Sequence, residues 1–134
     1  MAGVAFTGSN ATAAFINRAL AARDGAIPAL IAETGGMNAM IVDSSALPEQ
    51  AVRDVLASAF DSAGQRCSAA RLLFVQDDVA NRMITMLKGA MQELTVGDPE
   101  DYATDVGPVI DDEARIDLEA HKARMKAEGK VIAD

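Results

Sequence analysis

The sequence predicts an α/β fold with a mainly parallel sheet. Short apolar runs of strand length alternate with longer segments in which apolar residues recur every three or four positions. Glycine, asparagine and aspartate stand at the junctions, where turns and helix ends require them. No internal repeat and no low-complexity tract interrupts the alternation. Helical connections between successive strands are typical of parallel pairing.

The first part of the chain is expected to form a strand, a helix and a second strand. The run 4–7 is strand-like, and Gly8-Ser9-Asn10 supplies a tight turn and N-cap residue types before an alanine-rich helix over 11–23. Asp24-Gly25 ends this helix. A second strand follows over 27–32.

The remaining segments continue in the order strand, helix, strand, helix, loop, helix. Their expected ranges are 39–42, 48–63, 72–75, 79–94, 96–108 and 111–128. Pro48 suits the first turn of its helix, and the methionines of 79–94 are expected to fill the core. Two strand-like runs meet near Gly35-Gly36 with almost no loop, so the domain boundary is expected there.

Composition excludes several classes of function. The chain has 134 residues and a formal net charge of −8, which opposes binding to a nucleic-acid backbone. Its longest apolar stretches are far shorter than the ~18 residues of a membrane span. The chain contains one cysteine and therefore cannot form an internal disulfide, which favours a reducing, cytoplasmic setting.

Cys67 is the first candidate for chemistry. A lone cysteine is commonly a small buried hydrophobic residue, but Gly64-Gln65-Arg66 makes a polar approach to this one. Arg66 can favour the thiolate form, and Ser68-Ala69 allows a tight turn in which the Cys67 amide faces a developing oxyanion. These features favour a nucleophile over a core residue.

Glu33 is the second candidate. A glutamate at a strand end is commonly exposed to water, but this one closes an apolar run and precedes two glycines. We therefore expect a partly desolvated carboxylate that acts as a base near neutral pH. Glu33 is too distant from Cys67 in sequence to form a local pair.

The segment from Phe6 to Ser9 is the third candidate. A strand followed by glycine and a helix N-terminus offers amide donors to a phosphate. One such turn without the full Gly-x-Gly-x-x-Gly pattern is weak evidence for a dinucleotide site. No metal site is expected, because His121 stands alone on a charged surface helix and the acidic segments lack the spacing of a calcium loop.

Three segments, in this order, carry a resemblance to a known family. They read Val-Ala-Phe-Thr-Gly-Ser over 4–9, Glu-Thr-Gly-Gly-Met-Asn over 33–38 and Gly-Gln-Arg-Cys-Ser over 64–68. Together they resemble the aldehyde dehydrogenase superfamily, and the resemblance extends from Val4 to about Arg115. It implies a fragment of a three-layer α/β/α fold, with 1–35 ending the NAD-binding domain and 36–134 beginning the catalytic domain.

The resemblance also implies a role for each candidate residue. Cys67 would add to an aldehyde carbon, and Glu33 would activate water to hydrolyse the thioester. The residues implied to bind NAD are Thr7, Gly8, Ser9 and Gly35, and those implied to bind substrate are Arg66 and Ser68.

Within the superfamily, the wording around Glu33 and Cys67 is most similar to the dehydrogenase half of bifunctional bacterial flavoproteins of proline catabolism. This implies oxidation of L-glutamate γ-semialdehyde to L-glutamate with NAD, with FAD held in a separate proline dehydrogenase domain. The expected partners are the small aldehyde, the remainder of the parent polypeptide and further copies in a homo-oligomer. The fragment alone is expected to be inactive.

Two alternatives remain open from the sequence. Another semialdehyde or fatty aldehyde dehydrogenase would share Cys67 and Glu33. A non-catalytic interaction module of the same fold would instead contain a relict cysteine. The rate of thiol alkylation separates this module from an enzyme, because a catalytic cysteine is unusually reactive.

Overall fold

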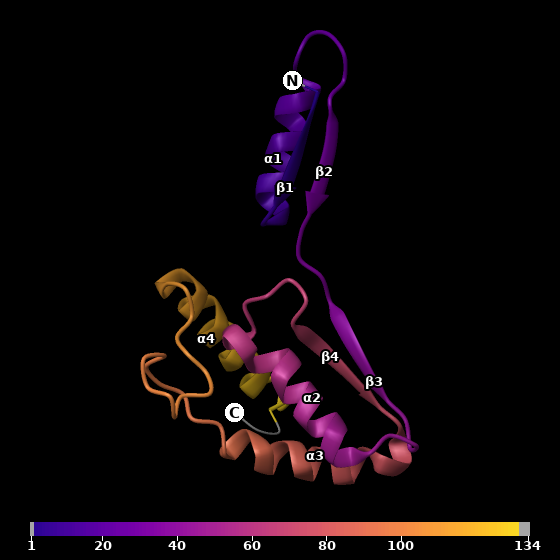
Figure 1. Cartoon of the computed structure of the whole chain (residues 1–134), viewed down its shortest axis with the longest axis vertical. Helices are drawn as coiled ribbons and strands as arrows, with labels where there is room; N and C mark the ends of the chain where they lie inside the picture. Colours follow the sequence, from indigo (N-terminus) through magenta and orange to yellow (C-terminus); the bar gives the residue numbers. More distant parts are fainter. Residues whose placement is uncertain (1, 132–134) are drawn as a thin grey trace. The chain divides into compact units, whose positions relative to one another are not determined.

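The computed structural model describes residues 2–131, which divide after Met37 into two compact units. Each unit contains a strand–helix–strand motif whose two strands pair in parallel (Figure 1). Both described sheets have two strands each. The predicted α/β class with parallel strands is therefore confirmed.

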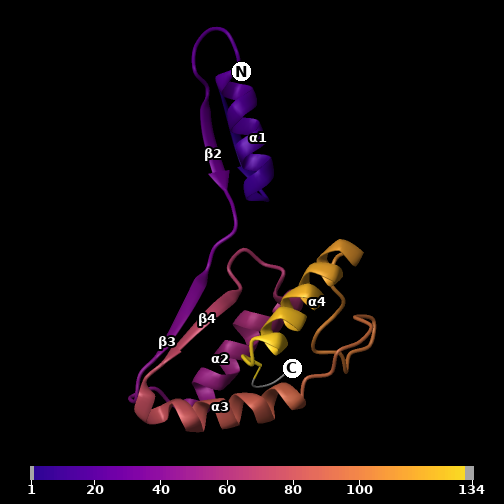
Figure 2. The same cartoon turned by 180° about the vertical axis from the view of Figure 1, so that it is seen from behind.

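The first unit consists of β1 (Gly3–Thr7), α1 (Asn10–Ala21) and β2 (Ala29–Glu33). The helix runs alongside the strands (Figure 2). The parallel register places Thr7 opposite Glu33, so the carboxyl ends of both strands lie at one edge. The second strand begins later than the expected residue 27, because Pro28 has no N–H to donate to a ladder.

The second unit contains most of the chain. Its elements are β3 (Asn38–Val42), α2 (Pro48–Phe60), the 3-10 turn η1 (Asp61–Gly64), β4 (Ala70–Val75), α3 (Asp77–Gln92) and α4 (Asp112–Ala127). Helices α2 and α3 pack against each other and against β4 (Figure 1). The helices and strands of this unit were expected within a few residues of their observed bounds, whereas η1 was not expected. No helix within residues 2–131 has the length and apolar content needed to cross a membrane.

The core of the second unit lies between the sheet and the two helices. Its buried members are Val42 on β3, Val52 on α2 and Met83 on α3. Met83 is only 1% exposed, which confirms that this methionine fills the core rather than lining a groove. Leu73 and Val75 of β4 pack against the same cluster.

Helix α2 is shorter than its apolar pattern indicates. The pattern extends to Ala63, but the helix ends at Phe60 because Ser62 and Ala63 have φ angles of 57° and 52°. These angles lie in the left-handed region and cannot continue an α-helix. Val52 and Val55 are the buried residues of this helix.

The opposite face of the second sheet is exposed in the part of the chain that the structure describes. Ile41 of β3 and Phe74 of β4 are register partners, and they are 82% and 57% exposed. Parallel sheets are normally covered on both faces, and continuous apolar runs are the usual sign of this. The apolar runs in these strands therefore match a sheet with a second covering layer.

We predict that Met83→Ala lowers the free energy of unfolding by about 2–5 kcal/mol, because it leaves a cavity where α3 meets the sheet. Met37→Ala is the matched control. That side chain is 71% exposed, so a change within about 0.5 kcal/mol is expected. Urea unfolding followed by circular dichroism measures both variants. Equal losses would contradict the assignment of Met83 to the core.

Candidate functional site

The first unit brings the predicted base and most of the predicted cofactor residues to one sheet edge. Thr7 and Glu33 are the last residues of their paired strands. The Gly8 N–H donates to the Glu33 carbonyl oxygen at 3.1 Å, which extends the ladder by one bond. A Cβ at Gly8 would lie 2.6 Å from the Phe6 ring, so any larger residue here would displace that ring.

The N-terminus of α1 follows directly from this turn. The Ser9 side chain caps the helix by accepting from the Thr12 N–H at 3.1 Å. Within residues 2–131 the N–H groups of Asn10 and Ala11 make no hydrogen bond. Since the Gly8 N–H is already used by Glu33, the free amide donors lie at the helix start rather than at the glycine.

Gly35 is different from Gly8. A Cβ at Gly35 would meet no atom of the described chain within 4 Å, and its φ lies outside the left-handed region. Neither the backbone nor the packing of this chain therefore requires glycine at this position. Its expected role near a cofactor remains a prediction.

The side chain of Glu33 does not have the environment expected from the sequence. We expected partial desolvation beside the glycines, but Glu33 is exposed. Glu33 lies at the end of β2, and in the described residues β2 pairs with one strand only, β1. Few side chains are therefore close enough to cover it. Within this chain alone Glu33 is a solvated carboxylate.

The second unit carries Cys67 on an exposed turn between η1 and β4. The Ala69 N–H donates to the Arg66 carbonyl oxygen at 3.1 Å and closes the turn. Ala69 is 1% exposed and anchors the turn in the interior. The Cys67 N–H makes no hydrogen bond to any residue from 2 to 131, so it is free to donate to an oxyanion.

Asn38, the first residue of β3, holds this turn from outside. Its Nδ2 atom donates to the carbonyl oxygens of Cys67 at 2.6 Å and Ala69 at 3.0 Å. The sequence analysis did not identify Asn38 as a site residue. Its only signal was its position at the end of the motif that begins at Glu33.

Arg66, predicted to favour the thiolate and to bind substrate, makes its contacts with the end of α2. Its guanidinium donates to the Ala57 carbonyl oxygen at 3.3 Å and lies 3.5 Å from the Asp61 carboxylate. The basic group is therefore directed back toward the end of α2. Ser68, the other predicted substrate residue, is exposed next to Cys67.

Two further side chains fix the start of the turn. Gln65 accepts from the Ile110 N–H at 2.6 Å and donates to the Ser62 carbonyl oxygen at 3.0 Å. Arg71 donates to the Gly64 carbonyl oxygen at 2.7 Å. The loop before α4 and the start of β4 are thereby tied to the segment that precedes Cys67.

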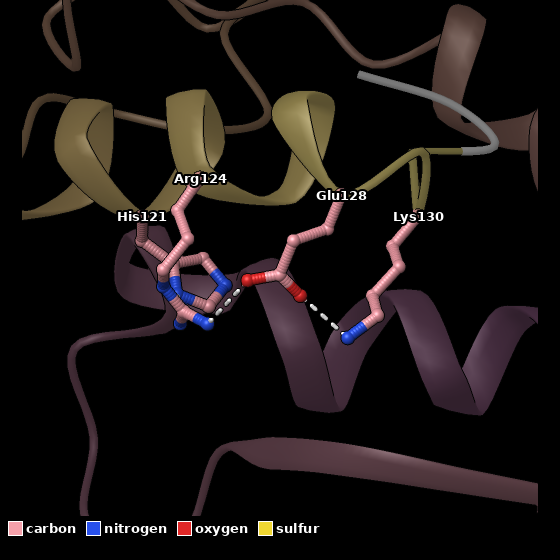
Figure 3. A network of polar contacts seen from close by, with 4 residues as sticks. All are labelled: His121, Arg124, Glu128 and Lys130. Carbon is pink, nitrogen blue, oxygen red and sulfur yellow. Dashed lines mark hydrogen bonds and ion pairs between the residues drawn. The ribbon is translucent and has the colours of Figure 1, made fainter.

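The weaker candidate His121 belongs to a surface network on α4 (Figure 3). Arg124 donates to Nδ1 of His121 at 3.0 Å and lies 3.6 Å from Glu128. Glu128 also pairs with Lys130. The predicted surface position of His121 is confirmed. Among the described residues, no three histidine, cysteine, aspartate or glutamate side chains are grouped so that they could hold a metal ion.

Comparison with known proteins identifies the family. The sequence model described as the aldehyde dehydrogenase family matches residues 1–134. The chain belongs to the aldehyde dehydrogenase family. This is the family that the three sequence motifs indicated, including those that contain Glu33 and Cys67.

Two curated relatives refine this result. The bifunctional protein PutA of Salmonella typhimurium is 58% identical over 134 residues, which cover 97% of this chain and 10% of that protein. A 1-pyrroline-5-carboxylate dehydrogenase of Bacillus cytotoxicus is 36% identical over 104 residues, covering 78% of this chain and 20% of the relative. The chain thus spans about a tenth of the PutA protein and corresponds to a fragment of such a protein.

Solved structures agree with the sequence relatives. Proline utilization A (PutA) of Bradyrhizobium japonicum, in a variant form, is 67% identical with a TM-score of 0.92, covering 95% of this chain and 13% of that one. A betaine aldehyde dehydrogenase of Staphylococcus aureus, in complex with NAD+ and with a modified cysteine, is 31% identical with a TM-score of 0.89. Its match covers 96% of this chain and 26% of that one.

We predict that Gly64→Ala destabilises the turn more than other glycine substitutions. Gly64 has a φ of 66°, and an added Cβ would lie 2.7 Å from the Ala59 carbonyl oxygen. We expect a loss of more than about 2 kcal/mol in the free energy of unfolding, because left-handed strain and a backbone clash add together.

Two glycines provide the controls for this variant. Gly129 also has a φ of 66° but no atom within 4 Å of its Cβ position, so Gly129→Ala tests the strain alone. Gly89, inside α3, has neither constraint, and Gly89→Ala is expected to stabilise the helix by up to about 1 kcal/mol. Urea unfolding ranks the three. A Gly64 variant no worse than the Gly129 variant would show that the contact with Ala59 is unimportant.

Proposed function

We propose that this chain is the nucleophile-bearing part of an NAD-dependent aldehyde dehydrogenase that oxidises L-glutamate γ-semialdehyde to L-glutamate in proline catabolism. The observation that carries the proposal is the exposed turn in which Cys67 has a free backbone N–H while the Asn38 side chain holds the carbonyl groups of Cys67 and Ala69. Such a turn presents a thiol and an oxyanion donor together.

Cys67 provides covalent catalysis in this proposal. Its thiolate forms a bond to the aldehyde carbon, and the carbonyl oxygen becomes an oxyanion that the Cys67 N–H can stabilise. Loss of hydride from this thiohemiacetal leaves a thioester on the sulfur. The exposed position of the turn allows a small substrate to reach the sulfur.

Glu33 is the proposed base for the second half of the reaction. Its carboxylate takes a proton from water, the oxygen of that water adds to the thioester carbon, and the carbon–sulfur bond breaks to release the acid. The strand-end position of Glu33 at the edge of the first sheet leaves the carboxylate accessible to water.

The residues of the first unit fit a phosphate-containing cofactor. The free N–H groups of Asn10 and Ala11 at the start of α1, together with the Ser9 cap, form an anion-binding helix terminus. The hydrogen bond from the Gly8 N–H to the Glu33 carbonyl oxygen holds the turn that precedes this helix. NAD, when bound, supplies the hydride acceptor. Thr7, Gly8, Ser9 and Gly35 are the proposed contacts.

The relatives support the substrate. They are a bifunctional PutA protein and a 1-pyrroline-5-carboxylate dehydrogenase. Hydrolysis of the cyclic imine 1-pyrroline-5-carboxylate gives glutamate semialdehyde. Ser68, exposed beside Cys67, is the proposed contact for the substrate carboxylate. Arg66, the second proposed substrate contact, also ties the turn to Ala57 and Asp61.

The chain is proposed to work as part of a larger protein. The exposed apolar face formed by Ile41, Leu72 and Phe74 supports this, because such a face is unusual on an isolated domain. If the whole protein is bifunctional like PutA, FAD belongs to its proline dehydrogenase part. Assembly into a homo-oligomer in a cytoplasmic setting is part of the same proposal.

We predict that Cys67→Ala in the full-length protein lowers the rate of aldehyde oxidation by at least about a thousandfold, because the nucleophile is lost. NAD affinity is expected to stay within about twofold. Ser68→Ala, the neighbouring variant, is expected to lower kcat/KM by about 10- to 100-fold through loss of one charge-assisted hydrogen bond. Steady-state kinetics and NAD titration measure these effects. Substantial oxidation by the Cys67 variant would rule out its role.

We predict that Glu33→Gln separates the two halves of the reaction. One equivalent of NADH per active site should still form in a burst, whereas steady-state turnover falls by at least about a hundredfold because the thioester persists. Glu49→Gln on α2 is the control, since Glu49 makes only an exposed ion pair with Arg82. Stopped-flow absorbance measures both phases. A parallel loss of burst and turnover would place Glu33 before hydride transfer.

A further inference from the structure

The side chain of Asn38 makes two hydrogen bonds through a single nitrogen. Its Nδ2 atom carries two N–H groups, and the structure directs it to the carbonyl oxygens of Cys67 at 2.6 Å and Ala69 at 3.0 Å. Asn38 is itself half-buried at the start of β3. Both donors of the amide are therefore committed to the cysteine turn.

These bonds hold the peptide group that links Cys67 to Ser68 and the one that links Ala69 to Ala70. The Cys67 carbonyl oxygen belongs to the peptide plane that follows the nucleophile, so holding it limits rotation about the Cys67 backbone. From inside the turn, the Ala69 N–H binds the Arg66 carbonyl oxygen. The bonds from Asn38 and from the Ala69 N–H together hold the peptide groups before and after Cys67, so the free Cys67 N–H keeps one orientation.

The strand pairing is irregular at this point. Asn38 pairs with Ala70, but Ala39 pairs with Leu72, so Arg71 is an extra residue in β4. This bulged residue directs its guanidinium to the Gly64 carbonyl oxygen at 2.7 Å. Bulges redirect side chains at functional sites, and here the bulge supports the other end of the same turn.

We infer that Asn38 is a positioning residue for the nucleophile, which sets the orientation of the Cys67 backbone N–H and thiol by holding the carbonyl groups of Cys67 and Ala69. The inference rests on the proposed function of Cys67. The role requires the N–H donors of the Asn38 amide. Aspartate has the same shape but would place a carboxylate oxygen against two carbonyl oxygens, and alanine would leave both carbonyls without this partner.

The test compares Asn38→Asp and Asn38→Ala in the full-length protein. The matched control is Asn81→Asp, which makes the same chemical change at an exposed position on α3. Hydrogen–deuterium exchange of the Ala69 amide reports the order of the turn. The burst rate of NADH formation reports the chemistry, and NAD affinity with the thermal midpoint reports the fold.

Both Asn38 variants are expected to exchange the Ala69 amide about tenfold faster and to form NADH about tenfold more slowly, since two hydrogen bonds of ordinary strength are lost. The aspartate variant is expected to be the more affected of the two. NAD affinity and thermal midpoint should match those of the unmodified protein. Asn81→Asp should change none of the four measurements.

The outcomes also distinguish this inference from the proposed function. An unmodified protein that oxidises the aldehyde, with Asn38 variants that behave like Asn81→Asp, would overturn the positioning role alone. If the unmodified protein formed no NADH but the Asn38 variants exchanged the Ala69 amide faster, Asn38 would be shown to order the turn and the proposed function would be rejected. Loss of NAD affinity together with the burst would show a general effect on the fold and would overturn the positioning role.

Discussion

The exposed turn that carries Cys67 depends on side chains from outside it that satisfy its carbonyl groups. Asn38 binds the carbonyls of Cys67 and Ala69, and Arg71 binds that of Gly64. A backbone segment without regular secondary structure can hold one geometry only if its polar groups have fixed partners. These partners bind the carbonyl groups, while the Cys67 N–H makes no bond within residues 2–131, and the proposed chemistry uses that free N–H.

The same turn also depends on how α2 ends. The left-handed conformation of Ser62, Ala63 and Gly64 stops the helix and redirects the chain toward β4. Such conformations cost about 1–2 kcal/mol per non-glycine residue, so they persist only where the surroundings enforce them. Gln65 and Arg66 provide part of that enforcement by binding Ser62 and Asp61, respectively.

Much of the fold could be predicted from the sequence, because local signals determine it. Apolar runs marked the strands, and Ser9 and Gly129 occur where the first and last helices begin and end. Proline chemistry explains why β2 starts at Ala29 rather than at residue 27. The end of α2 could not be predicted, because its amphipathic pattern continues to Ala63 and the backbone departs from it.

The candidate site could be predicted only in part. Cys67 and Glu33 were identified as candidates because their residue types and glycine neighbours suit their chemistry. Asn38 was missed, because its two hydrogen bonds connect positions 29 and 31 residues apart in sequence. The orientation of Arg66 and the exposure of Glu33 also depend on tertiary neighbours, so side-chain type alone could not predict them.

The account is tested most directly by locating the covalent intermediate. The full-length protein with Glu33→Gln would be mixed with glutamate semialdehyde and NAD, quenched in acid and digested for peptide mass spectrometry. The account predicts a glutamyl thioester on the peptide that contains Cys67, at close to one equivalent per active site. An acyl adduct on another residue, or NADH formation without any adduct on Cys67, would contradict it.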